Sequence, residues 1–309
     1  MVDYSIVVPV YHNEGSLRPL MDSIQKDVVL RHPDLAWEAI FVDDGSGDRS
    51  FEELLRIRDE FSPYVRLVKF TRNFGQMSAL LAGLSRCQGR CAIMMSADGQ
   101  DPPSLINDML KAHYEEGYEV VAGTREGREE SLYRIVTSRI FYYLMRRLAF
   151  PNMPLGGFDF MLLGERALKT CLANLDTDVA PQGIVLWTGY RTKFIPYFRQ
   201  KRTAGRSRWT FGKKLTALLD GVMGFSFFPI RLMSFLGTLF ALLGFLYALI
   251  IAIGKIVWGN PVQGWAPIMI AVLVIRGLQL VMLGVMGEYI WRVLAQVRNR
   301  QPYVIEKEL

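Results

Sequence analysis

Short apolar runs alternate with longer amphipathic stretches between Tyr4 and Val121. The short runs are rich in β-branched residues and predict strands at Ser5–Val10, Glu38–Val42, Arg66–Phe70, Cys91–Met95 and Glu119–Ala122. The longer stretches predict helices at Leu17–Val29, Phe51–Glu60, Gln76–Arg86 and Ser104–Glu116. This alternation predicts an α/β fold with a parallel sheet covered by helices.

The fourth predicted strand ends abruptly in the polar sequence Ser96-Ala97-Asp98-Gly99-Gln100. Ligands of open α/β sheets bind beyond the carboxyl ends of the strands. In an extended chain, Asp98 and Gln100 point the same way and could share one Mg²⁺ or Mn²⁺ with a nucleotide diphosphate. Asp101 would point to the opposite side. A polar turn after a core strand is the alternative.

Polar residues also follow the second and third strands. Asp43 and Asp44 could accept hydrogen bonds from a base or ribose, although turn and cap chemistry before the next helix is an alternative. Arg72 precedes a predicted helix start that suits a diphosphate. Neither GxGxxG after the first strand nor GxxxxGK[ST] is present, so the sequence supports neither a dinucleotide-binding fold nor a P-loop.

The last third of the chain contains two long apolar stretches. Leu232–Ile253 carries no charge and as a helix would span roughly 33 Å, enough to cross a bilayer. Trp265–Gly287 contains Arg276, which is expected to face a partner helix, water or another subunit. Basic residues flank the pair, while the connecting loop has only Lys255, so the positive-inside rule places both ends in the cytoplasm.

Composition indicates something beyond an ordinary core and an anionic partner, which could be nucleic acid, a membrane surface or a phosphorylated substrate. Apolar residues make up 50% of the chain, the formal charge is +6 and the pI is near 9.2. Three cysteines and three histidines are scattered, which argues against a zinc cluster or a disulfide framework. The first ten residues lack a basic leader and predict a strand rather than a secretory signal.

Two basic segments could contact phosphates. Residues 124–150 combine arginines with an apolar helical face, which suits either an interfacial helix on an anionic membrane or a helix packed on the sheet. Residues 197–209 form a basic loop rich in small residues that could close over phosphates or act as a solvated linker.

Asp159 lies between Phe158 and Phe160, after a glycine turn. Desolvation would raise the pKa of an unpaired carboxyl there and suit it to proton transfer or to orienting a nucleophile, whereas a structural salt bridge is an equal alternative.

Four motifs occur in the same order as in the family 2 glycosyltransferases of the GT-A fold. They are Val7-Val-Pro-Val-Tyr11-His-Asn-Glu14, Val42-Asp-Asp-Gly-Ser46, Arg72-Asn-Phe-Gly75 and Ala97-Asp-Gly-Gln-Asp-Pro-Pro103. Over nearly the whole chain, the sequence resembles the polyprenyl-phosphate glycosyltransferases related to dolichol-phosphate mannose synthase.

The resemblance implies a role for each motif. It assigns nucleotide binding to Pro9, Tyr11, Glu14, Asp43, Asp44, Asn73, Gly75 and Ala97. It assigns the metal to Asp98 and Gln100, catalysis to Asp159 with Asp98, and the acceptor phosphate to Arg125, Ser138, Arg139, Arg199, Arg202 and Ser207.

Two positions depart from the family pattern. Ser96 stands where the family usually has a first aspartate, which removes one negative charge and lowers the expected cation affinity. Met161 stands where the family has an arginine two residues after the catalytic acid, so that charge partner is missing.

Together these observations predict a Rossmann-like GT-A nucleotide-sugar domain at residues 1–210, with an interfacial helix at about 131–149. A juxtamembrane amphipathic segment (211–231), a transmembrane hairpin (232–290, spans about 232–254 and 265–288) and a cytoplasmic tail (291–309) follow. The protein would be a multi-pass protein of the inner (plasma) membrane with its catalytic domain and both termini in the cytoplasm.

The predicted reaction is an inverting, metal-assisted transfer of one sugar, glucose from UDP-glucose by family frequency, to polyprenyl (undecaprenyl) phosphate. No nucleic-acid partner is expected, and a homotetramer is a reasonable assembly. One alternative is a processive polysaccharide synthase, although Gly205 occupies the glutamine position of its Gln-x-x-Arg-Trp motif. The other is a non-catalytic membrane scaffold that kept the fold, which Ser96 would support.

Overall fold

The computed structural model describes residues 2–125, 142–154, 157–174, 181–199, 221–224, 226, 228–258, 265–298 and 300–309. The chain divides into two compact units. The first comprises Met1–Gly221 and Gln301–Leu309, and the second comprises Val222–Arg300.

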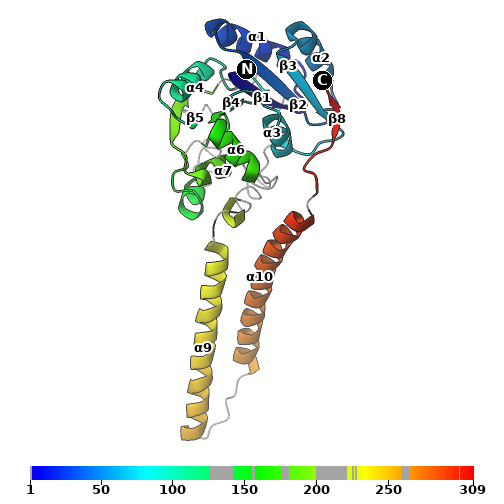
Figure 1. Cartoon of the computed structure of the whole chain (residues 1–309). Helices are drawn as coiled ribbons and strands as arrows, with labels where there is room; N and C mark the ends of the chain where they lie inside the picture. The colour runs from blue at the N-terminus through cyan, green and yellow to red at the C-terminus, as the bar shows by residue number, and fades with distance from the viewer. Residues whose placement is uncertain are drawn as a thin grey trace. The chain divides into compact units, whose positions relative to one another are not determined.

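Within the described part of the first unit, eight strands form one sheet in the order β7-β5-β6-β4-β1-β2-β3-β8 (Figure 1). The strands are β1 (Tyr4–Val10), β2 (Trp37–Asp43), β3 (Val65–Phe70), β4 (Cys91–Met94), β5 (Val120–Arg125), β6 (Met161–Gly164), β7 (Thr192–Tyr197) and β8 (Ile305–Glu308). The pairs β1–β2, β1–β4, β2–β3 and β5–β7 are parallel. β6 is antiparallel to β4 and β5, and β8 is antiparallel to β3. The sheet is therefore mixed rather than parallel throughout.

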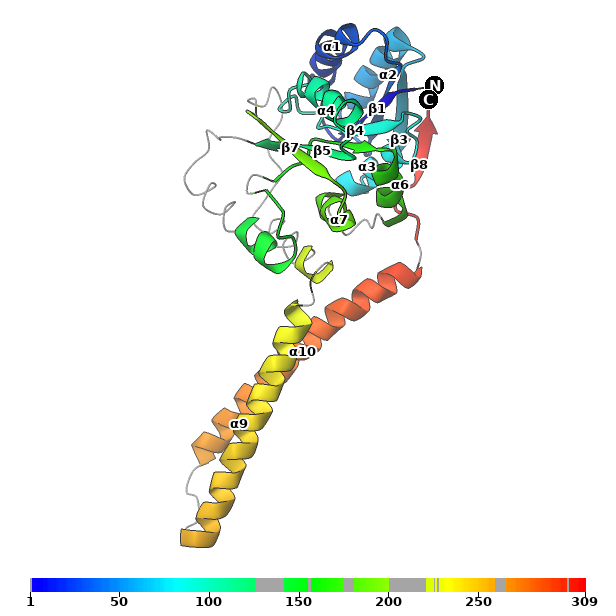
Figure 2. The ribbon, with the colours of Figure 1, turned by 60° about the vertical axis from the view of Figure 1, so that its left-hand side comes forward.

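Helices cover both faces of the sheet (Figure 2). One face carries α1 (Leu17–Asp27), α2 (Ser50–Phe61) and α4 (Leu105–Tyr114), and the other carries α3 (Gln76–Leu84) and α6 (Glu165–Asn174), with α7 (Pro181–Thr188) packed on α6. A short 3-10 helix, η1 (Val29–Arg31), follows α1.

Successive residues of β2 enter opposite cores, because side chains alternate across a strand. Phe41 packs under α1 and α2, while Ile40 and Val42 pack with Ala79 and Ala82 of α3. Since both faces are buried, the central strands read as continuous apolar runs rather than alternating ones.

The five predicted strands and four predicted helices are all present, with ends shifted by a few residues. Only residues 142–148 of the predicted interfacial helix are described, and they are helical, whereas 126–141 lie outside the described residues. The α/β class is confirmed, and the direction of β6 is the main difference from the predicted parallel sheet.

The segment predicted as a separate tail differs most from expectation. Residues up to Arg298 continue a long helix, and Ile305–Glu308 return to the first unit as edge strand β8. Tyr303 stacks on Phe70 with ring centroids 5.0 Å apart, and the Thr71 N–H donates to the Val304 carbonyl at 3.1 Å. The chain after the second apolar helix is thus part of the sheet.

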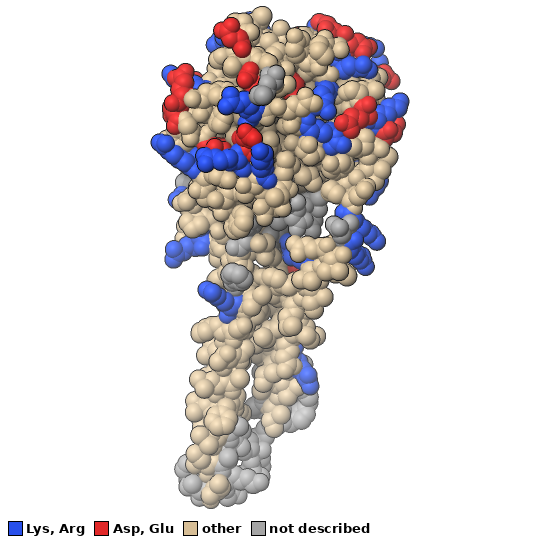
Figure 3. Space-filling model, viewed as in Figure 1, with Lys and Arg blue, Asp and Glu red and all other residues tan. Residues whose placement is uncertain are grey.

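The second unit consists mainly of α9 (Phe228–Trp258) and α10 (Trp265–Arg298), which pack against each other. By length and composition, Phe228–Tyr247 and Val274–Arg298 are candidate membrane spans. Few charged side chains interrupt the surface of these helices (Figure 3). Arg276 is exposed and donates to Gln279 of its own helix at 3.2 Å. Both predicted spans fall within these two helices.

We expect Tyr303→Ala to lower the free energy of unfolding of the first unit by about 1–2 kcal/mol, because it removes a stacked and partly buried ring. Glu306→Gln is the matched control, since it breaks only an exposed 3.0 Å ion pair with Lys69 and should cost less than about 1 kcal/mol. Denaturant unfolding of the full chain in detergent, followed by tryptophan fluorescence, measures both. Equal effects of the two variants would contradict the anchoring role of Tyr303.

Candidate active site

The loops that follow β1, β2, β3 and β4 emerge at one edge of the sheet, because these strands run parallel. Val10 pairs with Asp43 at the end of β1 and β2, and Val7 pairs with Met94 at the end of β4. Most of the predicted donor-site residues follow directly from these strand ends.

The buried carboxylate of Asp44 joins the β2 loop to the turn after β3. It accepts hydrogen bonds from the Phe74 N–H at 2.6 Å, the Gly75 N–H at 2.9 Å and the Asn73 amide at 2.9 Å. Burial raises the pKa of Asp44, and the two backbone N–H groups oppose that rise. Asn73 and Gly75 therefore lie against Asp44, which organises the turn.

Gly45 makes this approach possible. Its φ of +67° lies in the left-handed region, and a Cβ there would be 2.4 Å from the carbonyl carbon of Arg72. The two loops are in contact through their backbones, so no larger residue fits.

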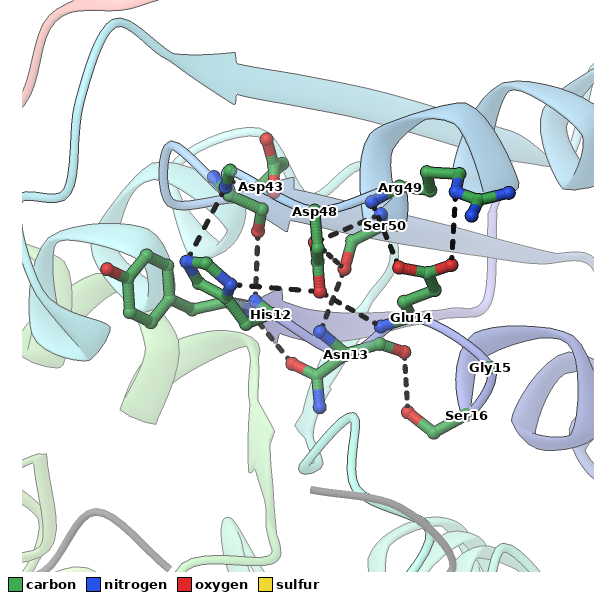
Figure 4. Close-up of polar contacts among 12 residues, drawn as sticks. His12, Asn13, Glu14, Gly15, Ser16, Asp43, Asp48, Arg49 and Ser50 are labelled. Atoms are coloured by element: carbon green, nitrogen blue, oxygen red, sulfur yellow. Dashed lines mark hydrogen bonds and ion pairs between the residues drawn. The ribbon is translucent and has the colours of Figure 1, made fainter. Parts of the chain in front are cut away.

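Further hydrogen bonds tie the loop after β1 to the start of α2 (Figure 4). The Asn13 N–H donates to Ser50 Oγ at 2.8 Å, and Asp48 Oδ1 accepts from the Ser50 hydroxyl at 2.6 Å. His12 adopts a φ of 54°, unusual for a residue other than glycine, and its N–H donates to Ser46 Oγ at 3.0 Å. The predicted turn chemistry is present, since Asp48 Oδ1 also accepts from the Ser50 N–H at 3.1 Å, whereas the N-cap residue of α2, Arg49, makes no side-chain cap hydrogen bond.

Glu14, in the loop after β1, contacts Arg49 just before the start of α2. Its carboxylate accepts from the Arg49 N–H at 3.3 Å and pairs with the Arg49 guanidinium at 3.4 Å (Figure 4). These contacts give Glu14 a role in joining the two loops.

Asp43 is fully buried at the end of β2, and burial raises the pKa of its carboxyl group. Oδ1 accepts from the Ser46 N–H at 3.3 Å, while Oδ2 has no hydrogen-bond partner among the described residues. Pro9 pairs with Val42 beside it, and Tyr11 packs edge-on against His12 with centroids 4.5 Å apart. Asp43 Oδ2 is thus a buried acceptor oxygen that no described residue satisfies.

The polar segment after β4 turns instead of remaining extended, because Gly99 has a φ of +68°. Ser96 Oγ consequently lies 2.9 Å from Asp98 Oδ1 and 2.5 Å from Asp101 Oδ2. The extended geometry assumed from the sequence, which placed Asp101 on the opposite side, was wrong. The Tyr197 hydroxyl donates to Asp101 Oδ1 at 2.5 Å.

The rest of this segment is also fixed. The Ala97 carbonyl accepts from the Ser16 hydroxyl at 2.8 Å, and the Gln100 N–H donates to Asp98 Oδ1 at 3.2 Å. Within the described ranges, no three His, Cys, Asp or Glu side chains group as a metal site. The residues present fit a cation that takes its other ligands from a bound diphosphate.

Arg199 brings a predicted acceptor residue next to the predicted metal residues. Its Nη2 lies 4.0 Å from Asp98 Oδ2, and its Nε lies 3.9 Å from Asp101 Oδ1. Arg199, which is predicted to bind the acceptor phosphate, therefore lies beside Asp98, which is predicted to bind the cation.

Asp159 has the charge partner that the sequence appeared to lack. Arg125 Nη2 pairs with Asp159 Oδ2, and the Gln182 amide donates to Oδ1 at 2.7 Å. Phe158 and Phe160 are buried, whereas the Asp159 side chain is 48% exposed. Desolvation by the surrounding protein raises the pKa of Asp159, but Arg125, together with Arg199 and Gln182, brings it below its ordinary value. Of the two alternatives considered for this carboxyl group, the structure therefore shows the salt bridge, and the pKa of Asp159 is lowered rather than raised.

Four predicted acceptor residues, Ser138, Arg139, Arg202 and Ser207, lie outside the described residues. Sequence reasoning missed Gln182, which donates to Asp159, and Tyr197, which donates to Asp101. No local motif marks either residue, since each acts through a contact more than twenty positions away along the chain.

The acids and arginines lie at the carboxyl ends of the strands, which is where open α/β sheets bind their ligands. Residues 5–172 match the family model for glycosyl transferase family 2. The chain therefore belongs to that family, has the GT-A fold and is a glycosyltransferase.

Relatives match over almost the whole chain. An uncharacterised glycosyltransferase of Bacillus subtilis is 33% identical, covering 99% of this chain and 94% of the relative. A prophage-derived bactoprenol glucosyl transferase of Shigella flexneri is 31% identical, covering 98% and 97%.

Solved structures resemble the chain more distantly. A mannosyltransferase of Pyrobaculum calidifontis, in complex with GDP-mannose and Mn²⁺, is 19% identical with a TM-score of 0.48, covering 66% of this chain and 57% of that one. Glucosyl-3-phosphoglycerate synthase of Mycobacterium tuberculosis, with Mn²⁺ and UDP, is 18% identical with a TM-score of 0.48, covering 72% and 77%.

We expect Gly45→Ala to destabilise the first unit by about 1–3 kcal/mol and to weaken UDP binding, because the added methyl pushes Arg72 and the turn away. Gly47→Ala is the matched control, since the nearest atom to its Cβ, His12 Cε1, is 3.6 Å away. Thermal unfolding and UDP titration calorimetry compare the two. A Gly45→Ala protein that binds UDP as tightly as the control would show that loop contact is not required.

Proposed function

We propose that this glycosyltransferase moves one glucose from UDP-glucose to polyprenyl phosphate, of the undecaprenyl type, with inversion at the anomeric carbon. The proposal rests above all on Arg199, which lies within 4.0 Å of Asp98 and joins the acceptor side to the donor side. The Shigella flexneri relative named bactoprenol glucosyl transferase supports the choice of sugar and lipid. A prophage homologue of such an enzyme in Escherichia coli, 28% identical over 98% of the chain, supports the same choice.

The donor nucleotide would bind along the edge formed by β1, β2 and the turn after β3. Asp43 Oδ2 would accept a hydrogen bond from an N–H of the base or an O–H of the ribose. Tyr11 and Pro9 would line this site, and Asn73 and Gly75 would contact the nucleotide from the turn that Asp44 holds. Ala97 would contact it from the β4 loop.

Asp98 and Gln100 would hold Mg²⁺ or Mn²⁺ together with oxygens of the donor diphosphate. When bound, such a cation stabilises the negative charge that grows on the leaving diphosphate. Because the protein contributes few charged ligands, we expect cation binding to depend on the nucleotide.

On the acceptor side, Arg199 and Arg125 would bind the lipid phosphate through directed guanidinium hydrogen bonds. Ser138, Arg139, Arg202 and Ser207 stay predictions for the same phosphate. A phosphate oxygen attacks the anomeric carbon as the bond from that carbon to the donor diphosphate breaks, and the electron pair of the broken bond goes to the diphosphate oxygen.

Asp159 would orient this attack rather than remove a proton. The acceptor phosphate is largely ionised near neutral pH, since its second pKa is about 6. The pairing with Arg125 keeps the pKa of Asp159 low, which makes the carboxylate a weak base and a good holder of cationic groups.

We place the first unit and both ends of the α9–α10 hairpin on the cytoplasmic side of the membrane. β8 follows α10 and shares a sheet with β1–β7, so the chain enters and leaves the hairpin on one side. Arg231 in the first turn of α9, Arg292 and Arg298 near the end of α10, and Arg300 after it are consistent with the positive-inside rule. A homotetramer stays a prediction.

We expect Asp98→Ala to reduce transfer by at least about 100-fold, because the cation and diphosphate lose their main anionic ligand. Asp108→Ala, an exposed carboxylate on α4, is the control and should be active. The assay uses purified full-length protein, Mn²⁺, radiolabelled UDP-glucose and a short polyprenyl phosphate, with products resolved by chromatography.

A lipid carrying one glucose supports the proposal, and a polymer would favour a processive synthase. Turnover with another nucleotide sugar but not UDP-glucose would overturn the choice of donor. Near-normal turnover by Asp98→Ala would contradict the assignment of Asp98 as a ligand of the cation.

We expect Arg125→Met to move the acidic limb of the pH–rate profile to higher pH. Arg125 lowers the pKa of Asp159, so its loss raises that pKa, and the carboxylate then protonates at a higher pH as the medium becomes more acidic. Arg125→Lys keeps the charge and should leave the limb close to that of the unmodified protein. The measurement is the ratio of the variant's transfer rate to that of the unmodified protein at saturating acceptor across pH 4–8, because the ionisation of the acceptor phosphate affects both proteins alike. An unmoved limb in Arg125→Met would show that ionisation of Asp159 does not control the rate.

A further inference from the structure

Ser96 Oγ lies between two carboxylates in the segment after β4. The hydroxyl has one hydrogen but faces two carboxylates, Asp101 Oδ2 at 2.5 Å and Asp98 Oδ1 at 2.9 Å. The shorter contact receives the hydrogen. The lone pairs of Ser96 Oγ are then left on the side of Asp98.

Asp101 is held in place to accept this hydrogen. Its side chain is 1% exposed, and its other oxygen accepts the Tyr197 hydroxyl at 2.5 Å. Tyr197 is itself buried and packs edge-on against Phe160, with ring centroids 6.3 Å apart. Each oxygen of the buried Asp101 carboxylate therefore accepts a hydroxyl hydrogen, which fixes the orientation of the carboxylate.

The spacing between Ser96 and Asp98 fits a shared cation. Ligands at 2.0–2.1 Å in octahedral geometry place neighbouring oxygens about 2.9 Å apart. Ser96 Oγ and Asp98 Oδ1 are 2.9 Å apart. A cation there would repel the hydroxyl hydrogen, so a ligand role requires that hydrogen to point away, as it does toward Asp101.

We propose that Ser96 Oγ and Asp98 Oδ1 are adjacent ligands of the divalent cation, and that Asp101 and Tyr197 are positioning residues that orient the Ser96 hydroxyl. This inference rests on the proposed function, because it concerns the cation of that same site. The buried Asp101 carboxylate also supplies, through the serine hydroxyl, part of the negative charge that the missing family aspartate would have supplied.

The test measures Mn²⁺ binding rather than turnover. Full-length protein in detergent is saturated with UDP, and free Mn²⁺ is followed by electron paramagnetic resonance. We expect Ser96→Ala to weaken Mn²⁺ binding by more than about tenfold and Tyr197→Phe by about tenfold, the size typical of lost supporting contacts. Ser96→Thr keeps the hydroxyl and should restore binding to within about threefold of the unmodified protein.

Two controls separate a local effect from damage to the fold. Tyr190→Phe removes a hydroxyl that contacts Thr170 at 2.9 Å, away from the site, and should bind Mn²⁺ normally. UDP binding without metal should be unchanged in Ser96→Ala and Tyr197→Phe, because neither residue lies among the predicted nucleotide contacts.

The two proposals fail in different ways. Normal Mn²⁺ binding by Ser96→Ala, alongside loss of binding by Asp98→Ala, would overturn the role of Ser96 and leave the proposed function intact. Normal binding by Tyr197→Phe with weak binding by Ser96→Ala would overturn only the positioning role. A protein that binds Mn²⁺ as predicted but transfers no sugar would overturn the proposed function and not the cation site.

Discussion

The hydrogen bonds that Asp44 accepts hold together the loops after β2 and β3, at the edge of the sheet where the nucleotide sugar is proposed to bind. A buried carboxylate is costly unless it is well satisfied, and here three N–H donors from Asn73, Phe74 and Gly75 satisfy it. These bonds fix the turn after β3 against the end of β2. Asp43, the next residue back, is consequently held with one oxygen free of partners among the described residues. Asp44 thus fixes the position of the turn after β3 relative to the end of β2, where Asp43 lies.

The remaining charges of the site are arranged in matched pairs and shared hydrogens. Arg125 pairs with Asp159, Arg199 lies between Asp98 and Asp101, and Ser96 and Tyr197 donate hydrogens to the acids. The two arginines offset part of the negative charge of the three acids, and an entering phosphate or cation must exchange partners with this network.

The sequence predicted those strands and helices whose formation depends on residues close together along the chain. Apolar runs with both faces buried gave the central strands correctly, and the amphipathic stretches gave α1 to α4. Asp43 and Asp98 could be identified because they end strands, and strand ends meet at one edge. Asp101 was placed wrongly because Gly99 turns the chain, which the assumption of extended backbone excluded.

What the sequence did not reveal depends on contacts between distant segments. Arg125 and Asp159 are 34 positions apart, and Asp101 and Tyr197 are 96 positions apart. β8 was missed because it is only four residues long, which is too short a pattern to indicate a strand. Its pairing with β3 also depends on tertiary contacts. The direction of β6 likewise depends on where it inserts, between β4 and β5.

The position of β8 in the sheet has a consequence for synthesis. Chains fold progressively as they leave the ribosome, the N-terminal parts first. β3 is made early, but its partner Ile305–Glu308 follows both apolar helices, so the backbone groups along one edge of β3 stay unpaired while the hairpin is made and inserted. An open strand edge can pair with other chains. Completion of the sheet is thus delayed until both apolar helices and the last residues of the strand have been synthesised.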